Sequence, residues 1–352
     1  MTKLKRVAKV AATTVVMVAI GWAGYEVFRP AYEGSAGIAH GKAYAPVRDK
    51  AVSFDVWYPA LAGGKAVTVG GNGVFHGTPA GRNAPHQEGK FPTVIISHGA
   101  GGNAGQFGWI ASKLAASGYV VVLPNHPGTT SGNASAHAAV RVWERPQDVT
   151  AVIDHMAEHH DEFGFADLDN IAMLGFSAGG YTAMAVSGAR VDPDKLQHFC
   201  DDTDHGMSDC AFLRHFGVDL HALDLSPAGQ DLRDARVKTS VIVDPGIVST
   251  MTPQSLTDIA IPMYIINLGT NETVPAGVHA LQASRLIGDA RHDFVPDATH
   301  FSFLARCKPG GPAILEKEGE LDPLCEDGGG RGRQALHDEL AARIIAYLDQ
   351  QT

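Results

Sequence analysis

The 352-residue chain has few aromatic residues, only four cysteines and no concentration of positive charge. Acidic residues outnumber Lys and Arg by 38 to 28, which gives a net charge of -10 with His neutral. Because an acidic chain without a basic cluster repels phosphate backbones, we expect no nucleic-acid partner. The apolar fraction of 45% still permits a large buried core, as in an ordinary globular protein.

The chain also lacks a full-length apolar run near its start. Residues 10–23 are uncharged and mostly apolar, but a bilayer-spanning helix needs about 20 such residues. Four Lys and Arg residues precede this run, and Gly21 and Ala23 are small, as a signal peptidase requires. We therefore expect residues 1–23 to be a signal peptide or, alternatively, an uncleaved anchor. The rest of the chain is then periplasmic or secreted, touching a membrane only through an uncleaved segment.

The four cysteines show no spacing typical of a metal site. In an exported protein an even number of cysteines permits disulfides. Three pairings are possible on paper. The local one, Cys200–Cys210 with Cys307–Cys325, would hold together two Gly- and Asp-rich segments of little apolar content, and it is the pairing that we expect. Four free thiols are the alternative.

Apolar, β-rich runs alternate with amphipathic helical patterns along most of the chain. The runs are nearly continuous in hydrophobicity, as in strands covered by helices on both faces. They comprise residues 93–97, 119–123, 171–176, 240–243, 263–267 and 292–295. Residues 147–159 and 333–347 have helical spacing. This alternation predicts an α/β protein with a doubly wound, mostly parallel sheet.

Other segments depart from this alternation. Residues 52–58 alternate in polarity and predict an antiparallel strand, and residues 62–90 are rich in turn-forming residues and predict a surface excursion. Residues 191–235 and 307–332 are polar and carry the cysteines. We interpret both as loop or cap insertions of one domain that spans residues 24–352.

A nucleophile motif lies between a predicted strand and a predicted helix. Residues 175–179 read Gly-Phe-Ser-Ala-Gly, after an apolar run and before the helical pattern of residues 180–186. A sharp turn between strand and helix exposes the serine hydroxyl at a helix N-terminus, where developing negative charge is favoured. Ser177 is therefore the expected nucleophile of a serine hydrolase.

A serine of normal acidity needs a base, and the base needs a carboxylate to fix its tautomer. His300 follows the last predicted strand, which is the position of the base in this kind of fold. Two carboxylates follow preceding strands. We favour Glu272, in the loop after residues 263–267, over Asp244, which ends the run 240–243.

The loop after the first parallel strand is rich in glycine. Residues 97–102 read Ser-His-Gly-Ala-Gly-Gly, and such a loop can direct a backbone N–H at a substrate oxyanion. We expect the amides of Ala100 and Ala178 to form the oxyanion hole.

Five segments occur in the order found in one known group. They are residues 97–102, Leu-Pro-Asn-His-Pro-Gly at 123–128, Arg-Pro-x-Asp at 145–148, the motif at 175–180, and His-Phe-Ser-Phe-Leu at 300–304. Over roughly residues 45–350 the chain resembles the bacterial predicted dienelactone-hydrolase group, which is similar to platelet-activating-factor acetylhydrolases. The resemblance implies an α/β-hydrolase fold with a Ser–acid–His triad and no metal or cofactor.

The resemblance also bears on the acid and the substrate. In the group the acid is usually Asp in a Gly-x-x-Asp loop, where this chain has Glu272; in the acetylhydrolases it follows the earlier strand, near Asp244. Dienelactone hydrolases use a cysteine nucleophile, whereas this chain has Ser177. The family name therefore gives no substrate. We expect hydrolysis of small-molecule or polymeric carboxylic esters. Lactone, amide or polyester cleavage, or a non-catalytic binding role, are the alternatives.

One motif points to different chemistry. His155, Glu158 and His159 form an H-x-x-E-H pattern, and on a helix the two histidines stand one turn apart. No clear third ligand accompanies them. We therefore expect adventitious metal binding by His155, His159 and His160 at most, and no catalytic zinc.

Overall fold

The computed structural model describes residues 31–201 and 205–351. The predicted signal peptide, residues 1–23, lies outside the described residues. Within the described ranges, the structure has no helix of the length and hydrophobicity that membrane crossing requires.

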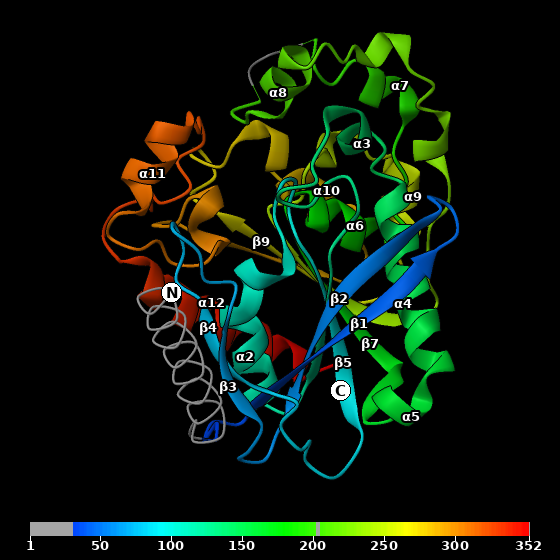
Figure 1. The fold of residues 1–352 in the computed structure, drawn as a ribbon. Coiled ribbons are helices and arrows are strands. Elements are labelled where there is room, and N and C mark those ends of the chain that lie inside the picture. The colour runs from blue at the N-terminus through cyan, green and yellow to red at the C-terminus, as the bar shows by residue number, and fades with distance from the viewer. Residues whose placement is uncertain (1–30, 202–204, 352) are drawn as a thin grey trace, which may run out of the picture.

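A ten-stranded sheet forms the centre of the molecule, in the order β10-β9-β8-β7-β5-β6-β2-β1-β4-β3 (Figure 1). The six strands from β10 to β6 in this order run parallel. Their bounds are Phe91–Ser97 (β5), Val120–Pro124 (β6), Ala166–Phe176 (β7), Val237–Val243 (β8), Met263–Leu268 (β9) and Ala290–Val295 (β10). Five of them contain one of the six apolar runs, and β6 overlaps the run 119–123. The inner strands are buried on both faces, whereas β10 lies at the edge of the sheet and is mostly half-buried. The predicted doubly wound, mostly parallel sheet is confirmed.

The other four strands extend the sheet beyond β6. Strand β2 (Lys50–Pro59) contains the predicted antiparallel strand and pairs with both β6 and β1 (Ala36–Ala45). The prediction for residues 62–90 was wrong in part, since β3 (Lys65–Val69) and β4 (Thr78–Arg82) lie there as an edge hairpin. These two strands are short and β4 carries Gly and Pro, so their pattern resembles that of a loop.

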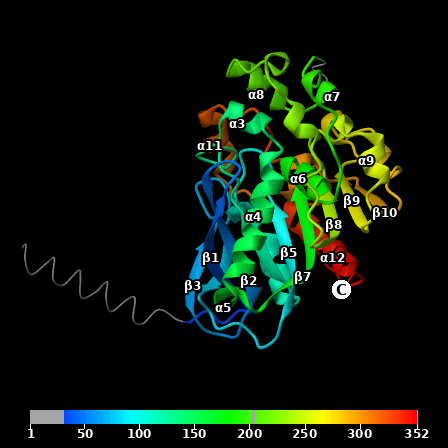
Figure 2. The same cartoon turned by 90° about the vertical axis from the view of Figure 1, so that its right-hand side faces the viewer.

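Helices cover the two faces of the sheet and enclose two cores (Figure 2). Helices α2 (Gly108–Ala116) and α12 (Arg333–Leu348) pack on one face through residues such as Leu114 and Leu340. Helices α4 (Glu144–Glu158) and α6 (Ala178–Val186) pack on the other, through residues such as Val152 and Met184. Shorter helices α9 (Pro253–Thr257) and α10 (Leu281–Ser284) add to this second face.

Helices from the two polar insertions gather beyond one end of the sheet (Figure 1). Residues 191–235 supply α7 (Pro193–Gln197), α8 (Asp209–His215) and the 3₁₀ turns η2 (Leu220–Ala222) and η3 (Ser226–Gly229), and residues 307–332 supply α11 (Gly311–Glu318). Helix α3 (Ala136–Val140) lies beside them (Figure 2). We refer to α3, residues 193–201 (α7 and the turn after it), α8, η2 and residues 320–322 together as the cap.

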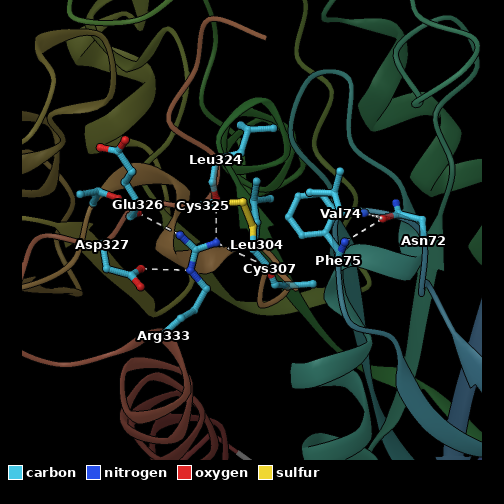
Figure 3. The surroundings of a disulfide bond; sticks show 12 residues. Asn72, Val74, Phe75, Leu304, Cys307, Leu324, Cys325, Glu326, Asp327 and Arg333 are labelled. Carbon is cyan, nitrogen blue, oxygen red and sulfur yellow. Dashed lines mark hydrogen bonds and ion pairs between the residues drawn. A yellow bond between two sulfur atoms is a disulfide. The ribbon is translucent and has the colours of Figure 1, made fainter. Parts of the chain in front are cut away.

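Two disulfides tie down these insertions. Cys200 pairs with Cys210 and Cys307 with Cys325, so the predicted local pairing is confirmed. Near the second disulfide, the buried Arg333 donates hydrogen bonds to the carbonyl oxygens of Leu324 and Glu326 (Figure 3). Covalent and polar links thus hold a segment with few apolar side chains, and the disulfides indicate an oxidising compartment.

Candidate active site

Ser177 occupies a strained turn between β7 and α6. Its backbone has φ 56° and ψ −120°, a conformation costly for a residue other than glycine. The close approach requires glycine nearby, because a Cβ on Gly179 would lie 1.8 Å from the carbonyl oxygen of Ser97. The N–H of Ser177 donates to Val243 and its carbonyl accepts from Gly246, which fixes the turn against β8. The structure therefore forms the nucleophile elbow that the motif predicts.

His300 begins a 3₁₀ turn, η6 (His300–Phe303), shortly after β10. Its imidazole is buried, with 4% of the residue exposed. The Nδ1 atom lies 3.0 Å from Oδ2 of Asp244, which is fully buried at the end of β8. A carboxylate at Nδ1 fixes the proton there and leaves the Nε2 lone pair available to a hydroxyl.

Hydrogen-bond donors surround the buried carboxylate of Asp244. Its Oδ1 accepts hydrogen bonds from the Nδ2 of Asn267 at 2.8 Å and from the N–H of Leu268 at 3.0 Å. Its other oxygen faces His300, so neither buried oxygen lacks a donor. Asn267, which did not stand out in the sequence as a site residue, is itself held by the carbonyl of Val278 and the N–H of Ala280. A buried Asn inside an apolar strand was the signal that could have marked this position.

Glu272 does not contact His300, contrary to the expectation from the sequence. It is exposed on the loop after β9, where the nearby side chain of Asn271 donates to it at 3.5 Å. The Thr270 hydroxyl lowers the pKa of Glu272 by hydrogen bonding. The carboxylate beside His300 is that of Asp244, because β8 ends next to the elbow while the loop carrying Glu272 turns outward into solvent.

Two cavities meet at Ser177. The larger, of about 300 Å³, is lined on the elbow side by Ala100, Ala178 and Tyr181. Its other walls are mostly apolar side chains of the cap and the segment after α3: Val140, Val142, Leu196, Phe199, Phe212, Leu213 and Leu220. The smaller, of about 160 Å³, contains both Ser177 and His300. Ser177 and His300 therefore face one space, and both polar insertions help to enclose it.

Three carboxylates of the cap, those of Asp209, Glu320 and Asp322, line both cavities. Burial raises the pKa of Asp322, against the opposing hydrogen bond from the Ser208 hydroxyl. This concentration of acidic groups disfavours an anionic substrate group in the same space.

The two expected oxyanion donors border the larger cavity together with Ser177. Ala178 is the first residue of α6, and amides in the first turn of a helix have no partner within that helix. Ala100 lies in the loop after β5, next to Gly99, where an added Cβ would lie 3.2 Å from the Cβ of Ser177. Both amides thus belong to segments next to Ser177.

A buried arginine fastens the loop that carries Ala100. The guanidinium of Arg145 donates to the carbonyl oxygen of His98, to Oγ1 of Thr129 at 2.7 Å and to Oγ1 of Thr182 at 3.1 Å. Thr182 belongs to α6, so one side chain joins the loop after β5 to the helix behind Ser177. Arg145 is 1% exposed, and burial lowers its pKa to about 9. In the sequence, Arg145 stood out only as part of a resemblance.

A second Ser–His–Asp set lies beneath the same loop. Nε2 of His126 is 2.9 Å from Oγ of Ser97, and its Nδ1 is 2.9 Å from Oδ2 of Asp148. Arg48 holds both oxygens of Asp148 at 2.9 Å. All three members of the set are fully buried, and burial lowers the pKa of His126 well below its usual value. A substrate cannot reach Ser97, so this set supports the loop and performs no chemistry.

Replacing Arg145 by Met should lower the free energy of unfolding by about 3 kcal/mol, because it leaves the oxygens of His98 and Thr129 buried without donors. Urea unfolding followed by circular dichroism measures this loss. Arg141→Met is the matched control, since Arg141 is half exposed and pairs only with Glu144 among its charged neighbours in the described chain. Equal effects of the two substitutions would contradict a special role for Arg145.

The H-x-x-E-H motif lies at the C-terminal end of α4, beside α5 (His160–Phe163) and away from the cap (Figure 1). The rings of His155 and His159 are 4.0 Å apart, and Nδ1 of His159 bonds to the carbonyl of His155. Within residues 31–201 and 205–351, the sole group of three ligand side chains close enough to share an ion is His198, Asp201 and His221, in the cap. The motif does not gather a third ligand.

Known structures share this architecture. A ferulic acid esterase from Streptomyces cinnamoneus superposes with a TM-score of 0.60 at 16% identity, over 92% of this chain and 90% of its own. The chain has the α/β-hydrolase fold. Two further structures match with lower scores. A dienelactone hydrolase from Anabaena variabilis gives a TM-score of 0.46 at 12% identity, over 81% and 95% of the two chains. An acylaminoacyl peptidase from Pyrococcus horikoshii gives a TM-score of 0.47 at 12% identity, over 76% of this chain and 38% of the peptidase.

Sequence comparison matches a shorter part of the chain. Residues 105–193 match the model of the prolyl oligopeptidase family, less than half of the chain but including the whole elbow. No curated protein matches the sequence. The fold and the match around Ser177 together support an enzyme of the serine hydrolase class.

Proposed function

We propose that this protein hydrolyses carboxylic esters through an acyl-enzyme, with Ser177 as nucleophile, His300 as base and Asp244 as the acid. The observation that carries the proposal is the buried pair of His300 and Asp244, 3.0 Å apart, beside a strained serine in the same cavity. A buried carboxylate at Nδ1 is the arrangement that makes an imidazole a base for a hydroxyl.

The proposed reaction has two half-reactions. His300 Nε2 takes the proton of the Ser177 hydroxyl as Oγ bonds to the ester carbonyl carbon, and the amides of Ala100 and Ala178 stabilise the oxyanion. His300 then returns the proton to the departing alcohol, and the C–O bond breaks. Water attacks the acyl-enzyme with His300 again as base, which releases the acid and regenerates the serine.

The larger cavity supports an uncharged, apolar substrate. Its walls are mainly aliphatic and aromatic side chains, and the three cap carboxylates disfavour anions. Its volume of about 300 Å³ is at the small end of ligand pockets, which typically measure about 300–1,000 Å³. Short acyl esters therefore suit it best, whether small molecules or the accessible ends of a polyester. The two disulfides support action in the periplasm or outside the cell.

The test is hydrolysis of p-nitrophenyl esters from acetate to palmitate, with and without a fluorophosphonate and with EDTA. We expect turnover that the fluorophosphonate abolishes and EDTA does not, with kcat/KM at least tenfold lower for palmitate than for butyrate because of the cavity size. Absence of both turnover and labelling would favour a non-catalytic binding protein. Loss of turnover in EDTA would point instead to metal chemistry.

A further inference from the structure

Three exposed side chains of the kinds that ligate metal ions lie close together on the cap. His198 caps the C-terminus of α7, Asp201 follows three residues later, and His221 lies in η2. One potential ligand atom from each lies within 4.8 Å of the other two, and all three residues are exposed. The imidazole rings of the two histidines are 5.0 Å apart and almost perpendicular, at 88°. The group combines two imidazoles with one carboxylate, so it offers both nitrogen and oxygen ligands to a metal ion.

The tautomer of His198 is fixed by its own helix. Its Nδ1 lies 2.8 Å from the carbonyl oxygen of Asp194. Because a carbonyl only accepts hydrogen bonds, Nδ1 carries the proton and Nε2 presents a lone pair outward. A backbone carbonyl on the second ring nitrogen is the usual support of a metal-bound histidine, since it fixes the ring and raises its basicity.

The backbone of His221 is also held in place. Its N–H donates to the carboxylate of Asp219 at 3.0 Å, and its carbonyl accepts from the side chain of Gln197 at 3.3 Å. Its Nε2 lies 2.7 Å from Oδ1 of Asp201. A cation bound here would replace the proton that this hydrogen bond places between the two groups.

We propose that His198, Asp201 and His221 bind one divalent transition-metal ion, with Zn²⁺ the best match to this ligand set. Imidazole nitrogen with one carboxylate oxygen suits Zn²⁺, whereas Ca²⁺ and Mg²⁺ require mostly oxygen ligands. Atoms about 2.1 Å from a tetrahedral zinc stand roughly 3.4 Å apart, so the observed spread requires only small side-chain rotations. Water would fill the fourth position.

The proposed ion would sit directly behind the wall of the larger cavity. Leu196, Phe199, Cys200 and Leu220 line that cavity, and each is within two residues of a proposed ligand. The ion would join the end of α7 to η2 and so restrain the wall on which the acyl group packs. This consequence, which rests on the proposed function, predicts that metal removal broadens the chain-length preference without abolishing turnover.

The test is titration of the EDTA-stripped, full-length protein, without a polyhistidine tag, with Co²⁺ and then Zn²⁺. We expect one equivalent of Co²⁺ to give the visible absorption of a tetrahedral site, and Zn²⁺ to displace it. His198→Ala and His221→Ala should each bind at least tenfold more weakly. His159→Ala is the matched control, an exposed histidine in the H-x-x-E-H motif, and should bind as the parent protein does.

Several outcomes would overturn the proposal: no saturable binding up to about 1 mM metal, unchanged binding in both cap variants, or loss of binding in His159→Ala instead. Thermal unfolding of each metal-free variant checks that the substitution has not disrupted the cap. Because absorption requires no substrate, the titration can be repeated in Ser177→Ala, so a failed esterase assay and a failed metal site remain distinguishable.

Discussion

Ser177→Ala should reduce kcat for a p-nitrophenyl ester by at least about 10⁴-fold, while the protein remains folded. The hydroxyl supplies the atom that bonds to the carbonyl carbon, and alanine has no such atom. Stability should change little or increase slightly, because the side chain faces a cavity and the φ of 56° is no easier for serine than for alanine. Steady-state kinetics and thermal unfolding measure the two effects.

Covalent labelling gives this prediction a built-in control. A fluorophosphonate should add one adduct to the parent protein, and peptide mass mapping should place it on Ser177. Ser97 has its own histidine, His126, which in turn contacts Asp148, and each contact measures 2.9 Å. It should nevertheless remain unlabelled because it is fully buried. Ser97→Ala should therefore keep the adduct and Ser177→Ala should lose it. Labelling of Ser97, or near-normal turnover in Ser177→Ala, would refute the proposed nucleophile.

The sequence predicted the parts of this molecule that depend on neighbouring residues. Each apolar run lies in a parallel strand, and for the inner strands the reason is that helices cover both faces of the sheet. The Gly-x-Ser-x-Gly pattern predicted the elbow because only glycine at position 179 tolerates the carbonyl of Ser97 at that distance. The predicted cysteine pairs were also confirmed, because each joins residues that are close in the sequence and closes a short polar segment.

Contacts between distant segments could not be predicted in the same way. Both Glu272 and Asp244 follow a strand, and sequence position does not show which loop turns toward His300. Asp244 lies beside His300 in part because Asn267 and Leu268 of β9 donate hydrogen bonds to its carboxylate at the end of β8. The roles of Arg145 and Arg48 are likewise set by partners up to 100 residues away. In β3 and β4, strand pairing overrides a loop-like composition.

Asp244→Asn should lower kcat by about 10⁴-fold, whereas Glu272→Gln should change it less than about twofold. Asparagine keeps the size of the side chain, but an amide N–H placed at Nδ1 of His300 would force the proton onto Nε2. The imidazole could then no longer accept the proton of Ser177. Glutamine at 272 removes only a charge on an exposed loop, where the nearest partners are Thr270 and Asn271.

The two variants make the same chemical change, a carboxylate to an amide, at two different positions, and neither is expected to alter the fold. Each keeps a side chain of nearly the same shape, so kcat can be read at equal stability once urea unfolding has been checked. The rate should recover partly at high pH in Asp244→Asn if hydroxide can replace the base, but not in Ser177→Ala. A larger loss in Glu272→Gln than in Asp244→Asn would mean that the loop after β9 swings inward during catalysis, and that the buried Asp244 only supports the turn.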